Sequence, residues 1–469
     1  MDMERQIVGK KPHFRPARHQ TSFYRVMFLI SLILGSIWVL LSIQRGQIKP
    51  AFLPTPTPTR TTQSYIMEAQ AYFNAGKLDD PDPPLPTPPN PDAIDTYKKA
   101  LQVDPNDAQA WAELARIQAY SSSMLRTDTE RKQRLEEALA SADKAIELAP
   151  DDSTAHAVRA FVLDWYASNP LIGKEEAQSK LAEANNEANH AYQLNYNNAL
   201  ALAYYAEILI DQQKFSQARK YAEQAVAEAP ELMDTHRAYG YVLETWGEYN
   251  SAIQEYKKAV DITPNMTFLY VIIGRLYREG IKNPTLALDY FDRAAGINQQ
   301  LAVQNPIPYL EIARTYTQQG QFFIAARNAE KALSLDKYNA STYGQLGLIF
   351  IQARNYEGAL PLLQCAVESC TAQENEMGQV AIQGLPLTSV TVAYYYVEYG
   401  TVMAFLSRPT AGEDFCPKAR QVLEQVRQKF PDDPTLMSIV QDSEGICNNL
   451  EGKGAPAATP TAVPETPQP

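Results

Sequence analysis

The chain has 469 residues, of which 54 are acidic and 42 are basic, so its net charge is −12. This negative charge argues against a general binder of nucleic acid or anionic lipid, and we expect no nucleic-acid partner. The length allows several ordinary domains or one long repeat array, and 45% apolar residues is enough for an extended core. Abundant Ala, Tyr, Gln and Leu in periodic segments predict an all-helical protein.

The N-terminal part of the chain has the pattern of a membrane anchor. Residues 1–22 form a basic arm, and residues 23–43 are mostly apolar, interrupted by Arg25 near their start. The uninterrupted part, Val26 to Ile43, is 18 residues long, which is in the lower range of length for a bilayer span, and positive charge is denser before it than after it. We therefore predict a single-pass transmembrane helix at 23–43 in the cytoplasmic membrane, with the N-terminus cytoplasmic and the remainder extracytoplasmic. A cleaved secretory signal is the alternative, although no small-x-small cleavage site follows Ile43.

Two proline- and threonine-rich segments flank the periodic part of the chain. Residues 44–63 predict an extended linker, and residues 451–469 predict a disordered tail. A further proline-rich stretch at 81–91 interrupts the first helical unit. It is either an inert insertion or a proline-rich ligand for a partner.

The clearest pattern lies in two consecutive units, residues 199–232 and 233–266. In each, apolar residues at steps of three and four occupy one face of a first helix, and Ala or Tyr occupy one face of a second. Small residues allow the two helices to touch closely, and Pro230 and Pro264 end the second helix. The second unit carries these features at His236, Tyr239, Gly240, Leu243, Gly247, Ala252, Tyr256, Ala259 and Pro264.

This pattern resembles the tetratricopeptide repeat, although His236 stands where the family prefers Trp. The resemblance implies helix-turn-helix pairs, each of which buries its apolar face only by stacking on its neighbours. We expect a tetratricopeptide α-solenoid over 64–450, with about nine repeats and a capping helix at 434–450. The clearest repeats are 199–232, 233–266, 306–339 and 340–373.

The family resemblance also indicates where a ligand would bind. In such folds the first helix of each pair lines a concave groove. The groove positions in this sequence are Arg237, Tyr241, Glu244, Arg275, Arg278 and Arg314. A line of arginines suits a carboxylate-bearing peptide or another anionic ligand. The asparagines of the family's carboxylate clamp are absent here, and the alternative is that the arginines pair with acidic neighbours such as Glu279 and Glu311.

The four cysteines all lie in the last quarter of the chain. If the chain is exported, disulfides are permitted, and three pairings are possible. A bond between Cys416 and Cys447 would join the ninth unit to the capping helix. Cys365 and Cys370 can bond only if their helix ends near Ala366, and buried free thiols are the alternative.

The sequence offers no constellation typical of catalysis. The five histidines have no metal-ligand spacing, and there is no nucleophile with an evident base, so we expect neither enzyme activity, metal nor cofactor. The resemblance instead implies a scaffold that binds a peptide or helix, and with the predicted anchor we expect its partner to be another envelope protein. The Pro/Thr spacers, the short N-terminal arm and the lack of organelle signals indicate a bacterial protein. A carbohydrate-binding or envelope polysaccharide-assembly module is the alternative. An enzyme built on residues 371–390 is disfavoured, since that insertion contains no histidine.

Overall fold

The computed structural model describes residues 22–44, 60–79, 91–125 and 128–452. It separates into two compact units, residues 1–60 and residues 61–469. The basic arm, the predicted tail except its first two residues, and most of the linker and of the proline-rich stretch at 81–91 lie outside the described residues.

The first unit contains one helix, α1 (Phe23–Gln44). Large apolar side chains along it are exposed, among them Phe28, Leu34 and Trp38. None of the helices among the described residues combines the length and the apolar character that crossing a bilayer requires. The structure therefore does not show the membrane span predicted at 23–43.

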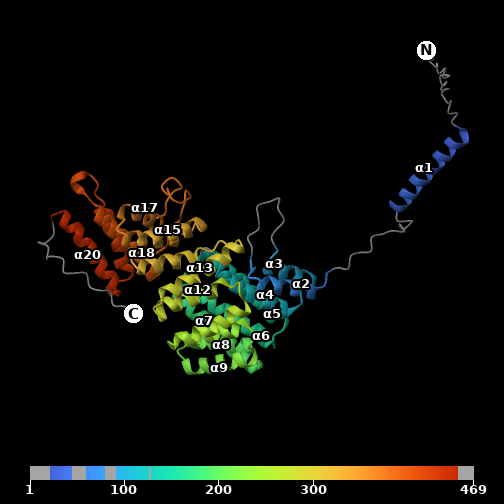
Figure 1. The fold of residues 1–469 in the computed structure, drawn as a ribbon, viewed down its shortest axis with the longest axis horizontal. Coiled ribbons are helices and arrows are strands. Elements are labelled where there is room, and N and C mark those ends of the chain that lie inside the picture. Colours follow the sequence, from blue (N-terminus) through green and yellow to red (C-terminus); the bar gives the residue numbers. More distant parts are fainter. Residues whose placement is uncertain (1–21, 45–59, 80–90, 126–127, 453–469) are drawn as a thin grey trace, which may run out of the picture. The chain divides into compact units, whose positions relative to one another are not determined.

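The second unit consists of helical pairs stacked side by side, which confirms the predicted all-helical solenoid (Figure 1). Its described residues form nine pairs and a final helix, and no strand beyond two isolated bridges. The first helices are α2 (Thr62–Asn74), α4 (Ala108–Ser122), α6 (Ser153–Ala167), α8 (Ala199–Asp211), α10 (Met233–Thr245), α12 (Thr267–Arg275, continued by a π-helical turn, Leu276–Gly280), α14 (Ile307–Gln318), α16 (Ala340–Gln352) and α18 (Val390–Leu406). The second helices are α3 (Ala93–Val103), α5 (Asp128–Leu148), α7 (Lys174–Leu194), α9 (Phe215–Glu228), α11 (Tyr249–Ile262), α13 (Pro284–Gln300), α15 (Phe322–Leu335), α17 (Tyr356–Val367) and α19 (Cys416–Lys429), followed by α20 (Pro434–Leu450).

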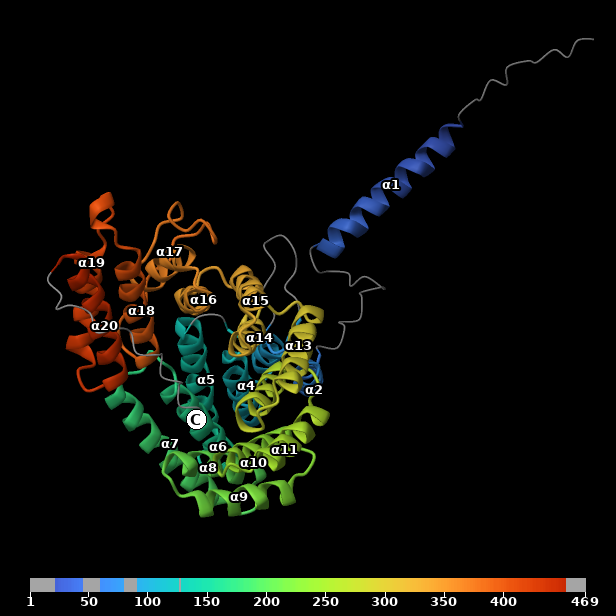
Figure 2. The same ribbon diagram turned by 60° about the vertical axis from the view of Figure 1, so that its left-hand side comes forward.

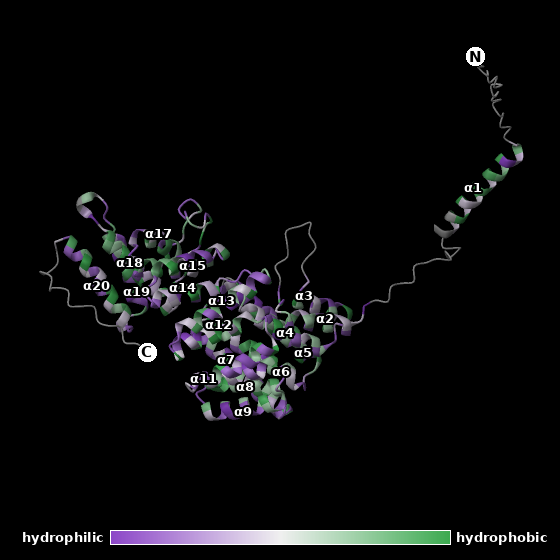
Figure 3. Cartoon of the chain, in the orientation of Figure 1, coloured by the Kyte–Doolittle hydropathy of each residue, from purple (hydrophilic) through white to green (hydrophobic). Residues whose placement is uncertain are grey.

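Local sequence sets where these helices begin and how they turn. Asp107, Asp152 and Asn198 are N-caps whose side chains accept backbone N–H bonds from the first turns of α4, α6 and α8. Gly247 has a positive φ of 74° between α10 and α11, where a residue without Cβ is favoured. The helices carry both hydrophobic and hydrophilic residues, as amphipathic helices do (Figure 3).

Alanine and tyrosine at the periodic positions are buried in the core, together with leucine, isoleucine, valine and phenylalanine. Ala218, Ala222 and Ala225 of α9 are fully buried, and Tyr256 of α11 lies directly over Gly240 of α10. A Cβ on Gly240 would meet the Tyr256 ring at 3.0 Å, so glycine allows the close approach of these two helices. Successive pairs follow a curved path from α2 to α20 (Figure 2).

Both cysteine pairs form disulfides. Cys416 at the start of α19 is bonded to Cys447 in α20, with Cα atoms 5.5 Å apart. Helix α17 ends at Val367, so Cys370 lies beyond it and turns back to Cys365, at a Cα separation of 4.8 Å. The early helix end is the condition under which the sequence allowed this second bond.

Candidate functional site

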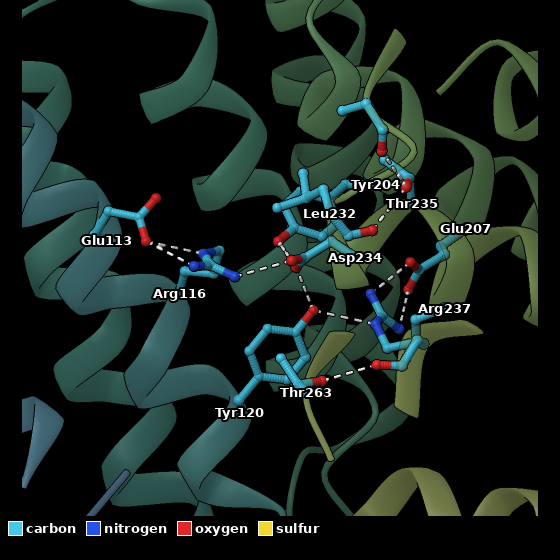
Figure 4. Close-up of polar contacts among 12 residues, drawn as sticks. Glu113, Arg116, Tyr120, Tyr204, Glu207, Leu232, Asp234, Thr235, Arg237 and Thr263 are labelled. Atoms are coloured by element: carbon cyan, nitrogen blue, oxygen red, sulfur yellow. Dashed lines mark hydrogen bonds and ion pairs between the residues drawn. The ribbon is translucent and has the colours of Figure 1, made fainter. Parts of the chain in front are cut away.

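The first helices of several pairs meet around one buried carboxylate, Asp234 of α10. Its side chain is fully buried and accepts hydrogen bonds from the hydroxyls of Tyr120 in α4 and Tyr204 in α8, both at 2.5 Å. Nη1 of Arg116, also in α4, donates to Oδ2 of Asp234 at 2.9 Å (Figure 4). Helices more than one hundred residues apart in the sequence are thus joined directly at the inner face of the solenoid.

These donors keep Asp234 ionised. Burial alone would raise the pKa of its carboxyl group, but the charges of Arg116 and Arg237 and the two tyrosine hydrogen bonds together lower it below its usual range. Asp234 therefore belongs to a buried structural ion pair whose hydrogen bonds are made within the protein.

Two of the predicted ligand arginines are buried in similar ion pairs. Arg237 is 6% exposed, and its two terminal nitrogens donate to both carboxylate oxygens of Glu207, at 2.9 and 2.6 Å. Its Nε donates to the Tyr120 hydroxyl at 3.1 Å. Arg278 is 4% exposed and lies 2.6 Å from Glu311. Neither guanidinium group presents a free edge to a ligand in this structure.

The other two arginines remain accessible. The side chains of Arg275 and Arg314 are 46% and 49% exposed, and they lie 2.7 and 3.5 Å from the same Glu311. Burial would raise the pKa of Glu311, but Arg275, Arg314 and Arg278 together lower it, so one carboxylate serves three guanidinium groups. This is the pairing with acidic neighbours that the sequence left as an alternative, and a ligand role for Arg275 and Arg314 stays a prediction.

A cavity of about 500 Å³ is lined mainly by the first helices of pairs three to six, with further residues from α4, α5, α11 and α14. Its wall includes Asp164 and Trp165 of α6, Glu207 and Asp211 of α8, Tyr241 of α10 and Phe268 of α12. Of the residues predicted from the sequence, Arg237, Tyr241 and Arg275 border this cavity. Glu244 instead accepts a hydrogen bond from the Tyr256 hydroxyl at 3.2 Å, and Arg278 and Arg314 lie outside the lining.

Sequence reasoning missed the acidic side of this cavity. It carried groove positions only to the fifth, sixth and seventh units, whereas Asp164, Trp165 and Asp211 belong to the third and fourth. Since the fourth and fifth units are 34 residues apart, Glu207 occupies the position of Tyr241 one repeat earlier. Applying the same 34-residue spacing to the fourth unit would have assigned Glu207 to the groove.

Comparisons with known proteins returned one family model and several solved structures. Residues 206–267 match a family model described as tetratricopeptide repeat, and the comparison with curated proteins returned no match. The chain is similar in structure to a protein in the APC/C hetero-tetramer Cut9–Hcn1 (15% identity, 86% of this chain and 81% of that chain covered, TM-score 0.44). It is also similar to TTC0263, a thermophilic protein of Thermus thermophilus (17%, 46% and 98%, TM-score 0.35), and to YrrB, described as having an unusual peptide-binding site (20%, 44% and 94%, TM-score 0.25). Over residues 206–267, therefore, the chain is similar in sequence to the tetratricopeptide repeat family.

Proposed function

We propose that this protein is a non-enzymatic scaffold whose inner face holds an extended peptide or a helix of another protein. The observation that carries the proposal is the cavity among α6, α8, α10 and α12, which has the size and the mixed aromatic and charged lining of a ligand site. Concave surfaces of stacked helical repeats commonly serve this purpose. The similarity of residues 206–267 to a family that binds proteins and peptides supports the same function.

A site-specific photocrosslink tests this function in the full-length chain. A benzophenone amino acid replaces Ile272, a partly buried residue of the cavity wall, and the matched control carries it at Met67, which is 63% exposed on α2 outside the cavity. We expect irradiation of intact cells to give a discrete protein adduct from position 272 and not from position 67. Absence of an adduct at 272, or the same adducts from both positions, would refute binding in the groove.

The aromatic wall gives a specific reason to keep a second candidate, a carbohydrate-binding module. Trp165 and Phe268 line the cavity, and aromatic faces in a groove suit sugar rings. Envelope polysaccharide fragments added during crosslinking at position 272 distinguish the two. An adduct with the polysaccharide at position 272, with no protein adduct in its absence, would favour the carbohydrate module.

We further propose that α1 anchors the scaffold in the cytoplasmic membrane of a bacterium, with the N-terminus cytoplasmic and the solenoid extracytoplasmic. Its support is the apolar sequence at 23–43, the basic residues before it and the exposed apolar side chains of α1. Replacement of Leu34 by Arg should release the chain from membranes washed at alkaline pH, whereas Leu34→Ile should leave it there. Release of the unchanged chain by the same wash would contradict the anchor.

A further inference from the structure

The lining of the cavity carries three arginines and three acidic residues, and the two kinds of residue differ in how they are paired. Arg237 pairs with Glu207, and Arg275 shares Glu311 with Arg278 and Arg314. The remaining arginine of the lining, Arg131, lies 2.7 Å from Asp128. Among the residues that the structure describes, no basic side chain forms an ion pair with Asp164 or Asp211, so two carboxyl groups of the cavity lack a counter-charge.

Asp164 is the less satisfied of the two. Its Oδ1 atom is buried without a hydrogen-bond partner among the described residues, and the residue belongs to the lining of the cavity. Burial first, then the charge of Asp211 and a hydrogen bond with its carboxyl group, and then Glu207, raise the pKa of Asp164 well above its usual range, against the opposing effect of Arg237. A buried acceptor with no donor costs free energy, and a ligand that supplies a donor would recover it.

The neighbouring tyrosine, Tyr241, is surrounded by the same carboxyl groups. Burial raises the pKa of Tyr241, and every charged neighbour that acts on it, from Asp211 and Glu207 to Asp164 and Glu244, raises it further. Tyr241 comes from α10, while the two unpaired carboxyl groups come from α6 and α8. The acidic side of the cavity is thus built from more than one helix.

Aromatic rings complete the walls beside these carboxyl groups. The Trp165 ring packs edge-on against Tyr120, with ring centroids 5.6 Å apart, and the Phe268 ring is stacked on the same tyrosine at 5.7 Å. Because their positions are fixed by these contacts, the rings offer preformed faces at the cavity. Carboxylates combined with aromatic faces are the surroundings that a planar guanidinium group prefers, because it donates several hydrogen bonds and stacks on a ring.

We propose that this cavity binds an arginine side chain of the partner peptide, with the guanidinium group paired to Asp164 and Asp211 and lying against Trp165. This inference rests on the proposed peptide-binding function and specifies its chemistry. The arginines in the sequence suggested an anionic ligand, whereas this proposal assigns a cationic one. The reason is that Arg237 already forms an ion pair with Glu207, while Asp164 forms none with the residues that the structure describes. The cavity exceeds the size of one side chain, so the adjoining peptide backbone also enters it.

The test titrates the full-length chain, in mild detergent where solubility requires it, with N-acetyl-arginine amide. N-acetyl-citrulline amide is the control ligand, since it has nearly the same shape without the charge. Binding is followed by tryptophan fluorescence, for which Trp165 is the reporter in the cavity and Trp165→Phe identifies its signal. We expect saturable binding of the arginine amide and at least about tenfold weaker binding of the citrulline amide.

Three isosteric variants locate the site. Asp164→Asn and Asp211→Asn should each lower the affinity for the arginine amide by roughly tenfold. Asp442→Asn, at an exposed position on α20, should leave this affinity unchanged. Asp211 is itself exposed, so its variant remains informative if Asp164→Asn folds poorly. Equal affinity for the citrulline amide, or unchanged affinity in both cavity variants, or no binding of the arginine amide, would overturn the inference.

The crosslink at position 272 separates this inference from the function on which it rests. A partner adduct that persists while the arginine amide fails to bind would refute arginine recognition and leave the scaffold intact. Loss of the adduct together with binding of the arginine amide would refute the scaffold and leave a cation site.

Discussion

At the scale of single residues, Asp234 is the group on which the inner face most depends. Changing Asp234 to Ala removes the acceptor of Tyr120 and Tyr204 and one of the two carboxylates that pair with Arg116, all of them buried. We expect the free energy of unfolding at neutral pH to fall by about 3 kcal/mol, the order found when one partner of a buried ion pair is deleted. Denaturant titration of the two proteins measures this difference.

The pH dependence of the same difference follows from the lowered pKa of Asp234. A group with a lower pKa in the folded state contributes stability above its unfolded pKa, and this contribution disappears as the pH falls through the folded value. The difference in the free energy of unfolding between the wild type and Asp234→Ala should therefore become smaller at acidic pH. The surface control Asp442→Ala should change the free energy of unfolding by less than about 0.5 kcal/mol. An equally small change for Asp234→Ala at neutral pH would contradict the structural role given to Asp234.

Asp164 should show the opposite sign. Its pKa is raised by burial and by Asp211 and Glu207, so the folded state binds a proton more tightly than the unfolded state does. Stability then declines as the pH rises from the unfolded value, about 4, through the folded value. We expect Asp164→Asn to remove this decline and to unfold at a higher temperature than the wild type at about pH 8, with the difference vanishing near about pH 4. A lower melting temperature than the wild type in the alkaline range would show that the carboxyl group is already satisfied.

At the scale of one helical pair, two glycines of α12 and α13 make opposite predictions. A Cβ on Gly274 would overlap Cε1 of Phe291, a fully buried ring of the facing helix, whereas a Cβ on Gly296 would meet nothing within 4 Å. Gly274→Ala should therefore destabilise the protein by about 1–3 kcal/mol, because overpacking outweighs a gain in helix propensity of about 1 kcal/mol. Gly296→Ala retains that gain without the clash and should be stabilising. Equal effects of the two changes on the unfolding midpoint would refute this account of the interface.

At the scale of the whole molecule, the sequence predicts contacts between residues that are close in the chain, and it does not predict contacts between residues that are far apart in the chain. Helix pairs, their turns and the Gly240–Tyr256 contact depend on spacings within one repeat, and these were predictable. The environment of Arg237 depends on Tyr120, which is 117 residues away, and the Asn265 amide donates to the carbonyl oxygen of Ala75 across 190 residues. Periodicity assigns a residue to the inner face, but only the curvature of the array decides whether that face meets a ligand or another helix.

These long contacts lie in the first two-thirds of the solenoid, so its C-terminal end depends on neighbours and on the Cys416–Cys447 bond. Helix α20 contacts α18 and α19, with the Ser443 and Thr401 hydroxyls 2.8 Å apart. Replacing both cysteines by serine should lower the local opening free energy of α19 and α20 by about 2–4 kcal/mol. Hydrogen exchange measures this locally, and protection of α8 to α11 should not change, since an end repeat of a solenoid opens without its distant neighbours. Uniform loss of protection would instead show that the contacts around Asp234 make the array one cooperative unit.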